Sequence, residues 1–355
     1  DKKVNRKQTQ MLLDLALDTP NAWKFDAKTW PWKRTLPDTS LKKDVPSDKF
    51  TIAFGGGAGY VPPHERMWDT IGAIDPRALL LLGDNVYIDD PKTPEMQLFH
   101  YYRRQSQPEW SKLAKKVPIY AIWDDHDYGP NDSDGSYSYK EMASEIFQLF
   151  WGNPNYDVTG KGGITGTFQW ADLEFFLLDN RYHRTANRNF TEDRQMLGKK
   201  QIDWLINALA ASRAPFKFIV IGGQVLSTEA AFENHAIFPD ERNYLLQKIR
   251  EAKIEGVVFL DGDRHHTILS VYQESRDVYP LYDLTCSSLT AGANSRKEPL
   301  NTNGIEETFV GEHNFGLLNV SGPRRDRVLK MSILDKNGET LWSRDIRETD
   351  LKYED

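Results

Sequence analysis

The sequence predicts an α/β protein in which sheets are covered by helices, and three observations support this prediction. From Phe50 onward, short apolar runs alternate with patterns of helical period, as they do in βαβ units. Acidic and histidine-containing clusters follow directly after several of these runs, and in α/β sheets sites assemble at the carboxyl ends of strands. The apolar runs are far shorter than the roughly 20 residues that span a bilayer, so we expect no transmembrane segment.

The expected helices open after Pro62-Pro63, span about 94–105 and 139–150, and include the periodic stretch from Ile202 to Leu209. The expected strands are, in order, Phe50–Phe54, Ala78–Leu82, Pro118–Trp123, Gly166–Trp170, Leu173–Leu178, Lys217–Ile221, Gly256–Leu260, Thr267–Tyr272, Leu281–Leu284, Gly316–Val320, Val328–Leu334 and Thr340–Ser343.

Length and charge bound the class of protein. The chain has 355 residues, 39% of them hydrophobic and 27% charged, which is typical of a globular protein. Its net charge of −7 gives no general attraction for nucleic acid, and we find no nucleic-acid-binding signature. Because the polar clusters all follow strands of one system of sheets, we predict a single catalytic domain over 49–355. An N-terminal arm, 1–48, would pack on this domain. The sequence does not indicate an oligomeric state.

One cysteine, Cys286, is present, so an intramolecular disulfide and a thiolate-rich metal site are both excluded. We interpret Cys286 as a small buried hydrophobe. The chain begins at Asp1 rather than Met, from which we expect a mature exported protein, periplasmic or secreted. The absence of disulfides is also compatible with the cytoplasm.

The clusters after the strands contain Asp84, Asp125, Arg181 and the pair Asp263 and His265. Carboxylates with imidazoles suit hard or borderline cations. Two cations about 3.5–4 Å apart would polarise a phosphoryl oxygen and generate hydroxide for in-line attack. The alternative is that each Asp only forms a turn or caps a helix, but four clusters at the same sheet edge make that the weaker explanation.

Three motifs resemble those of one family. Gly83-Asp84-Asn85-Val86-Tyr87, the block from Trp123 to Gly129, and Gly262-Asp263-Arg264-His265 are similar to motifs of the alkaline phosphatase D (PhoD-like) family of calcineurin-like metallophosphoesterases. The resemblance covers roughly Phe50 to Leu289. It implies a four-layer α/β/β/α sandwich and a dinuclear metal centre that hydrolyses phosphate monoesters or diesters of small molecules by attack of metal-bound hydroxide.

The resemblance also implies a role for each matching residue. Asp84 would bridge the two metals, and Tyr87 would bind one of them as a phenolate. His126 would be the catalytic histidine that protonates the leaving oxygen or stabilises charge. Arg181 would clamp phosphate oxygens, with a structural salt bridge as an equally favoured alternative. The other metal ligands would be Asp125, Asp263 and His265.

The sequence departs from the family after the first strand, where the family usually has a cysteine ligand and this chain has Gly57. Water, His64 or another group would then complete the site, or one site would be empty. We expect activity to be retained, with Ca2+ plus Fe3+ or another divalent ion (Zn2+, Mn2+ or Mg2+) as cofactors. The run Gly55 to Gly59 would let the backbone pass close to the metals, or cradle a phosphate.

Two other functions stay open. The same site would serve a phospholipase-D-like or other ester hydrolase, for example one acting on sulfates. Alternatively, the chain is a degenerate module that binds ligands without catalysis, against which the presence of His126, Asp263 and His265 argues.

Overall fold

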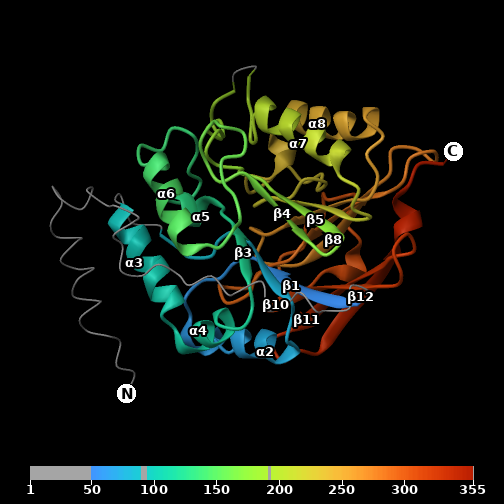
Figure 1. Cartoon of the computed structure of the whole chain (residues 1–355). Helices are drawn as coiled ribbons and strands as arrows, with labels where there is room; N and C mark the ends of the chain where they lie inside the picture. Colours follow the sequence, from blue (N-terminus) through green and yellow to red (C-terminus); the bar gives the residue numbers. More distant parts are fainter. Residues whose placement is uncertain (1–48, 89–93, 191–192, 355) are drawn as a thin grey trace.

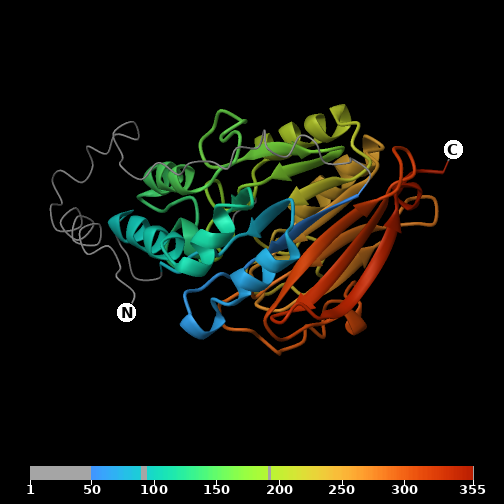
Figure 2. The same cartoon turned by 60° about the horizontal axis from the view of Figure 1, so that its bottom comes forward.

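The computed structural model describes residues 49–88, 94–190 and 193–354, and within them two six-stranded mixed sheets (Figure 1). The first sheet has the order β12 (Thr340–Arg347), β11 (Val328–Asp335), β10 (Asn314–Ser321), β1 (Phe50–Gly55), β2 (Ala78–Leu82), β3 (Ile119–Ile122). The second has the order β4 (Gly166–Trp170), β5 (Leu173–Leu177), β6 (Lys217–Val220), β7 (Val257–Asp261), β9 (Leu281–Thr285), β8 (Ile268–Tyr272). Figure 2 shows that β10, β11 and β12 form an antiparallel ribbon along the C-terminal side of the first sheet.

Helices cover the outside of this pair of sheets. In Figure 1, α7 (Lys199–Ala211) and α8 (Pro239–Glu251) lie together on one side, and α2 (Met67–Ile74) and α4 (Pro108–Ala114) lie on the opposite side. The remaining helices are α3 (Pro94–Gln105), α5 (Asp125–Tyr128) and α6 (Lys140–Phe150). The predicted α/β/β/α sandwich is therefore confirmed.

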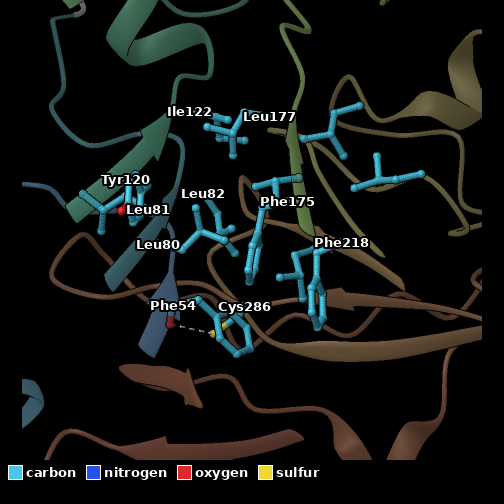
Figure 3. Packing of buried hydrophobic residues seen from close by; sticks show 14 of the residues in the cluster. Phe54, Leu80, Leu81, Leu82, Tyr120, Ile122, Phe175, Leu177, Phe218 and Cys286 are labelled. Carbon is cyan, nitrogen blue, oxygen red and sulfur yellow. Dashed lines mark hydrogen bonds between the residues drawn. The ribbon is translucent and has the colours of Figure 1, made fainter. Parts of the chain in front are cut away.

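The core lies between the sheets, and aromatic side chains join them (Figure 3). Tyr120 of β3 stacks across the interface on Phe168 of β4 with ring centroids 3.9 Å apart, and within the second sheet Phe175 of β5 stacks on Phe218 of β6 at 4.8 Å. Offset stacking of this kind adds to the apolar burial that holds two sheets together. This packing fixes the position of one sheet on the other, and with it the position of their edges.

The parallel strands bring their carboxyl ends to a common edge. β1, β2 and β3 are parallel to one another, as are β5, β6, β7 and β9. An isolated parallel bridge between Gly56 and Ser287 joins the ends of β1 and β9, so the two edges meet. A Cβ on Gly56 would lie 3.2 Å from the Cα of Gly262, closer than most such contacts, so glycine eases this approach of the two backbones.

The predicted strands are found within a few residues, except that β12 continues to Arg347. Three helices were not predicted: the single turn α5, and the longer α4 and α8. Both α4 and α8 begin with a proline and have a thin apolar face, Trp110 and Leu113 in α4 and Leu245 and Ile249 in α8. The arm predicted over 1–48 lies outside the described residues. Across the described ranges, every helix is too short or too polar to cross a membrane.

Candidate metal and phosphate site

The edge where the strands end collects most of the residues that the sequence singles out. Asp84 follows β2, the segment Asp124 to His126 follows β3, and Asp263 and His265 follow β7. The loops cross closely, since the Ala58 N–H donates to the Asp84 carbonyl at 2.7 Å and the Gly262 N–H to the Gly222 carbonyl at 3.0 Å. Side chains separated by 180 residues thereby share one small volume.

A first group of ligand atoms lies at the centre of this edge. One atom from each of Asp84, Asp125 and His126 lies within 4.8 Å of the other two. The Tyr87 hydroxyl donates to Asp84 Oδ2 at 3.3 Å and lies 2.8 Å from His265 Nε2. The rings of Tyr87 and His126 are 4.4 Å apart between centroids. The structure thus brings five of the seven predicted residues into contact.

Asp263 borders the same group. Its backbone has a φ of 62°, a left-handed conformation that Asp adopts more readily than most residues. Its Oδ2 is buried, has no hydrogen-bond partner, and lies 4.0 Å from Arg264 Nη1. Burial and the negative charge of Asp124 raise the pKa of Asp263 well above its usual range, despite the opposing effect of Arg264.

The electrostatics of the group fit a cation. Burial raises the pKa of Asp84 well above its usual range, and the charges of Asp125 and Asp124 raise it further. Asp84 Oδ1 and Asp125 Oδ1 are buried and accept no hydrogen bond, as is also true of Asp263 Oδ2. Burying carboxylates without donors or cations is costly. Oxygen atoms left in this way are suitable ligands for a hard metal ion, which would compensate their charge.

A bound cation would affect the protonation of Tyr87 and of His265 in different ways. Burial and the charge of Asp84 raise the pKa of the Tyr87 phenol well above its usual value, a direction that a nearby cation reverses. Burial lowers the pKa of His265, and His126 lowers it further, against a hydrogen bond with the backbone of Gly292. A neutral imidazole is the form that binds metal.

The guanidinium of Arg181 is already committed to carboxylates. Its Nε donates to Asp124 Oδ1 at 2.6 Å, its Nη2 lies 2.5 Å from the same oxygen, and its Nη1 donates to Glu233. Its Nη2 also lies 3.7 Å from Asp125 Oδ1. The side chain is buried, so the geometry favours the salt bridge over the phosphate clamp of the two alternatives that the sequence left open.

A second acid group, formed by Asp125, Asp132 and Glu233, adjoins the first. Their ligand atoms lie within 4.8 Å of one another. A hydrogen bond with Glu233, and then burial, raise the pKa of Asp132 to about 7. Burial opposes the ionisation of Glu233, but Arg181 and the hydrogen bond with Asp132 lower its pKa to about 2.

Sequence reasoning assigned no role to Asp124, Asp132 or Glu233. Asp124 and Asp132 lie within or just after the second motif and were therefore within reach. Glu233 lies in a loop after β6 that carries no recognisable pattern, and only the structure brings it to the site.

Three further side chains have partners outside the two acid groups. His64 is half-buried beside His313, with ring centroids 4.0 Å apart and its Nδ1 3.3 Å from the Thr290 carbonyl oxygen. His266 is fully buried and lies 3.4 Å from Glu298. Cys286 is fully buried in the core with its thiol 3.8 Å from the Phe54 carbonyl (Figure 3). Its thiol is therefore directed into the core.

Comparisons with known proteins identify the family and the fold. A family model described as PhoD-like phosphatase matches residues 52–321. The solved structure of PhoD superimposes with a TM-score of 0.67 at 15% identity, covering 84% of this chain and 72% of that one. The structure of GAP50, the anchor in the inner membrane complex of Plasmodium, gives a TM-score of 0.53 at 14% identity, covering 87% and 90%. No curated protein matches significantly.

Proposed function

Because the chain belongs to the PhoD-like phosphatase family, we propose that it is a metal-dependent phosphoesterase that hydrolyses phosphate monoesters or diesters of small molecules. The observation that carries the proposal is the group of Asp84, Asp125 and Asp263, each with a buried oxygen that accepts no hydrogen bond. Such a group is costly in a protein without a cation and useful in one that binds cations and phosphate together.

Two cations would be held by Asp84, Tyr87, Asp125, Asp263 and His265, with Asp84 as the ligand that they would share. When bound, the cations would polarise the phosphoryl oxygen and lower the pKa of a water molecule, which supports hydrolysis at neutral pH.

Residues of the chain would protonate the leaving oxygen and hold the carboxylates in position. His126 stacks near Tyr87 and adjoins Asp125, a position from which its imidazole can donate a proton to the leaving oxygen. Arg181 acts here as a positioning residue, since its two short contacts hold the carboxylate of Asp124 next to Asp125. Glu233 fixes the other end of the same guanidinium.

The donor set bears on which metals fit. It consists of carboxylates, one phenol and one or two imidazoles, without a thiolate, because Cys286 lies in the core. Oxygen-rich sites suit Ca2+, Mg2+ and Mn2+, and imidazole adds Zn2+. Fe3+ would depend on Tyr87 as a phenolate. We propose Ca2+ or another divalent ion in both sites, with iron bound only where Tyr87 ionises.

The test is metal content measured together with turnover. The purified protein would be stripped with a chelator and reconstituted separately with Ca2+, Mg2+, Mn2+, Zn2+ or Fe3+. Bound metal would be counted by mass spectrometry, and hydrolysis followed with p-nitrophenyl phosphate, its bis ester and p-nitrophenyl sulfate. We expect two ions per chain and turnover of at least one phosphate ester.

Two other results would overturn the proposal. Turnover of the sulfate ester alone would make the chain a hydrolase of a different ester. Absence of both bound metal and turnover would instead favour a ligand-binding module without catalysis.

A further inference from the structure

A strained turn projects an aromatic ring beside the site. The turn runs from Ala231 to Asn234, closed by a hydrogen bond of 3.3 Å from the Asn234 N–H to the Ala231 carbonyl. Its two central residues, Phe232 and Glu233, have φ values of 48° and 63°. Both values belong to the left-handed region, as in a type I′ turn, where Gly, Asn and Asp are usual. A phenylalanine there is unfavourable by the local rule and calls for a reason.

Glu233 explains half of this conformation. Its carboxylate pairs with Arg181 and lies 3.5 Å from Arg184 Nη2, and its carbonyl accepts from the same Nη2 at 2.9 Å. These bonds fasten the turn to the acid groups. They do not explain Phe232, whose side chain takes no part in them.

Phe232 directly precedes Glu233 of the second acid group, and its ring has arginine neighbours. The guanidinium of Arg264 lies 4.1 Å from the centroid of the ring, and that of Arg296 lies 5.8 Å from it. Arg264 is itself buried and fixed, because its Nε donates to Glu298 at 2.6 Å. It directly follows Asp263. The ring is thus connected to the site at two points. Phe232 is the sequence neighbour of Glu233, and Arg264, which contacts the ring, is the sequence neighbour of Asp263.

The ring is nonetheless 52% exposed. An exposed apolar ring gains little free energy from burial, and the left-handed backbone costs about 1–3 kcal/mol for a residue of this kind. Such strain, found next to a polar site, points to a binding role rather than to a contribution to stability.

We propose that Phe232 is the surface on which the organic group of the substrate rests, and that the site selects phosphate esters whose alcohol carries a flat aromatic ring. The exposed part of the Phe232 ring would stack on an aryl group or a nucleobase while the phosphate binds the cations held by the acid groups. Arg264 supports the ring through a cation–π contact. This inference rests on the proposed function, because it concerns the substrate of the same site.

The chain supplies a matched control in Phe190. Its ring is 81% exposed and lies 5.3 Å from the guanidinium of Arg194, so it has the same chemistry. Neither Phe190 nor Arg194 contacts a residue of the two acid groups through any interaction that the structure describes.

The experiment compares Phe232→Gly, Phe232→Tyr and Phe190→Ala with the wild type, each loaded with the same metal. The substrates are phenyl phosphate and methyl phosphate. Glycine suits a positive φ, so Phe232→Gly should keep or raise the melting temperature. We expect its KM for phenyl phosphate to rise roughly three- to tenfold, the range of an aromatic contact, with methyl phosphate unchanged. Phe232→Tyr and Phe190→Ala should resemble the wild type.

Two results would overturn this inference and leave the phosphoesterase standing. In one, Phe232→Gly loses the same factor on both substrates, which would mean that the turn only positions Glu233. In the other, neither substrate is affected. A wild type that hydrolyses no phosphate ester with any metal would instead remove the proposed function, and this inference with it.

Discussion

Two buried acids in this molecule have opposite surroundings. Glu241, on α8, accepts backbone N–H bonds from Met196, Leu197 and Gly198 at 2.7–3.0 Å, and lies 3.1 Å from His235 Nε2. Burial would raise its pKa, but the bonds from His235 and from the backbone lower it below its usual value. Asp84 has mainly other carboxylates for neighbours, and its pKa is raised.

The difference separates an acid that stabilises the fold from one that the fold tolerates. Donors around Glu241 favour its charged form, so ionised Glu241 ties the segment before α7 to α8. The surroundings of Asp84 disfavour its charge until a cation arrives. A buried carboxylate thus serves structure in one region and, by our proposal, metal binding in the other.

Replacing Asp84 with Asn should have the largest effect on activity. The variant removes the carboxylate proposed to lie between the cations, so turnover of p-nitrophenyl phosphate should fall at least ~10³-fold, in line with the loss of a major electrostatic contact in a catalytic site. The φ of Asp84 is 54°, and Asn tolerates that conformation, so the metal-free variant should melt within a few degrees of the metal-free wild type. Full activity with full metal content would show that Asp84 holds neither ion.

For Glu241→Gln we expect the reverse of Asp84→Asn, namely a loss of stability with activity kept. An amide nitrogen placed among N–H donors leaves bonds unmade, so the free energy of unfolding should fall by about 2–3 kcal/mol, while turnover per folded molecule changes little. Urea unfolding at pH 7 measures the first quantity. Glu251→Gln, on the exposed face of the same helix, is the control and should leave the free energy of unfolding almost unchanged. Equal effects of the two variants would remove the structural role of Glu241.

The pH dependence of this loss sharpens the comparison. Because the pKa of Glu241 is lower in the folded than in the unfolded protein, its contribution is fully present above its unfolded value, about 4.3, and is lost as pH falls through the folded pKa. The stability gap between wild type and Glu241→Gln should therefore be constant from pH 7 to about 5 and should narrow below about 4. A gap that stays constant down to pH 3.5 would contradict the assigned bonds.

The sequence predicts one of these two regions far better than the other. Asp84, Asp125 and Asp263 each follow a buried strand, and parallel topology alone brings strand ends together, so their convergence follows from pattern. Glu241 gives no such signal, since it is an acid in the first turn of a helix with few apolar residues. Its role depends on a loop 43 residues earlier that packs against it.

Phe232 and Glu233 could not be predicted for a different reason. They occupy a turn whose φ values contradict the preferences of both residues, and long-range contacts with Arg181, Arg184 and Arg264 hold them there. Local rules fail where tertiary contacts compensate strain. Arg181 is a similar case. The sequence left open a phosphate clamp and a salt bridge, and its three neighbouring carboxylates favour the salt bridge.

Cys286 offers the smallest effect and a direct check that the site lacks a thiolate. Burial raises the pKa of its thiol to about 12, so at pH 8 the native protein should contain almost no thiolate. We expect iodoacetamide to label the protein only after unfolding. Cys286→Ala should bind metal and turn over substrate as the wild type does, losing about 1 kcal/mol of stability with the sulfur's apolar contacts. Rapid labelling of the native protein, or loss of an ion in the alanine variant, would mean that the thiol reaches the metal site after all.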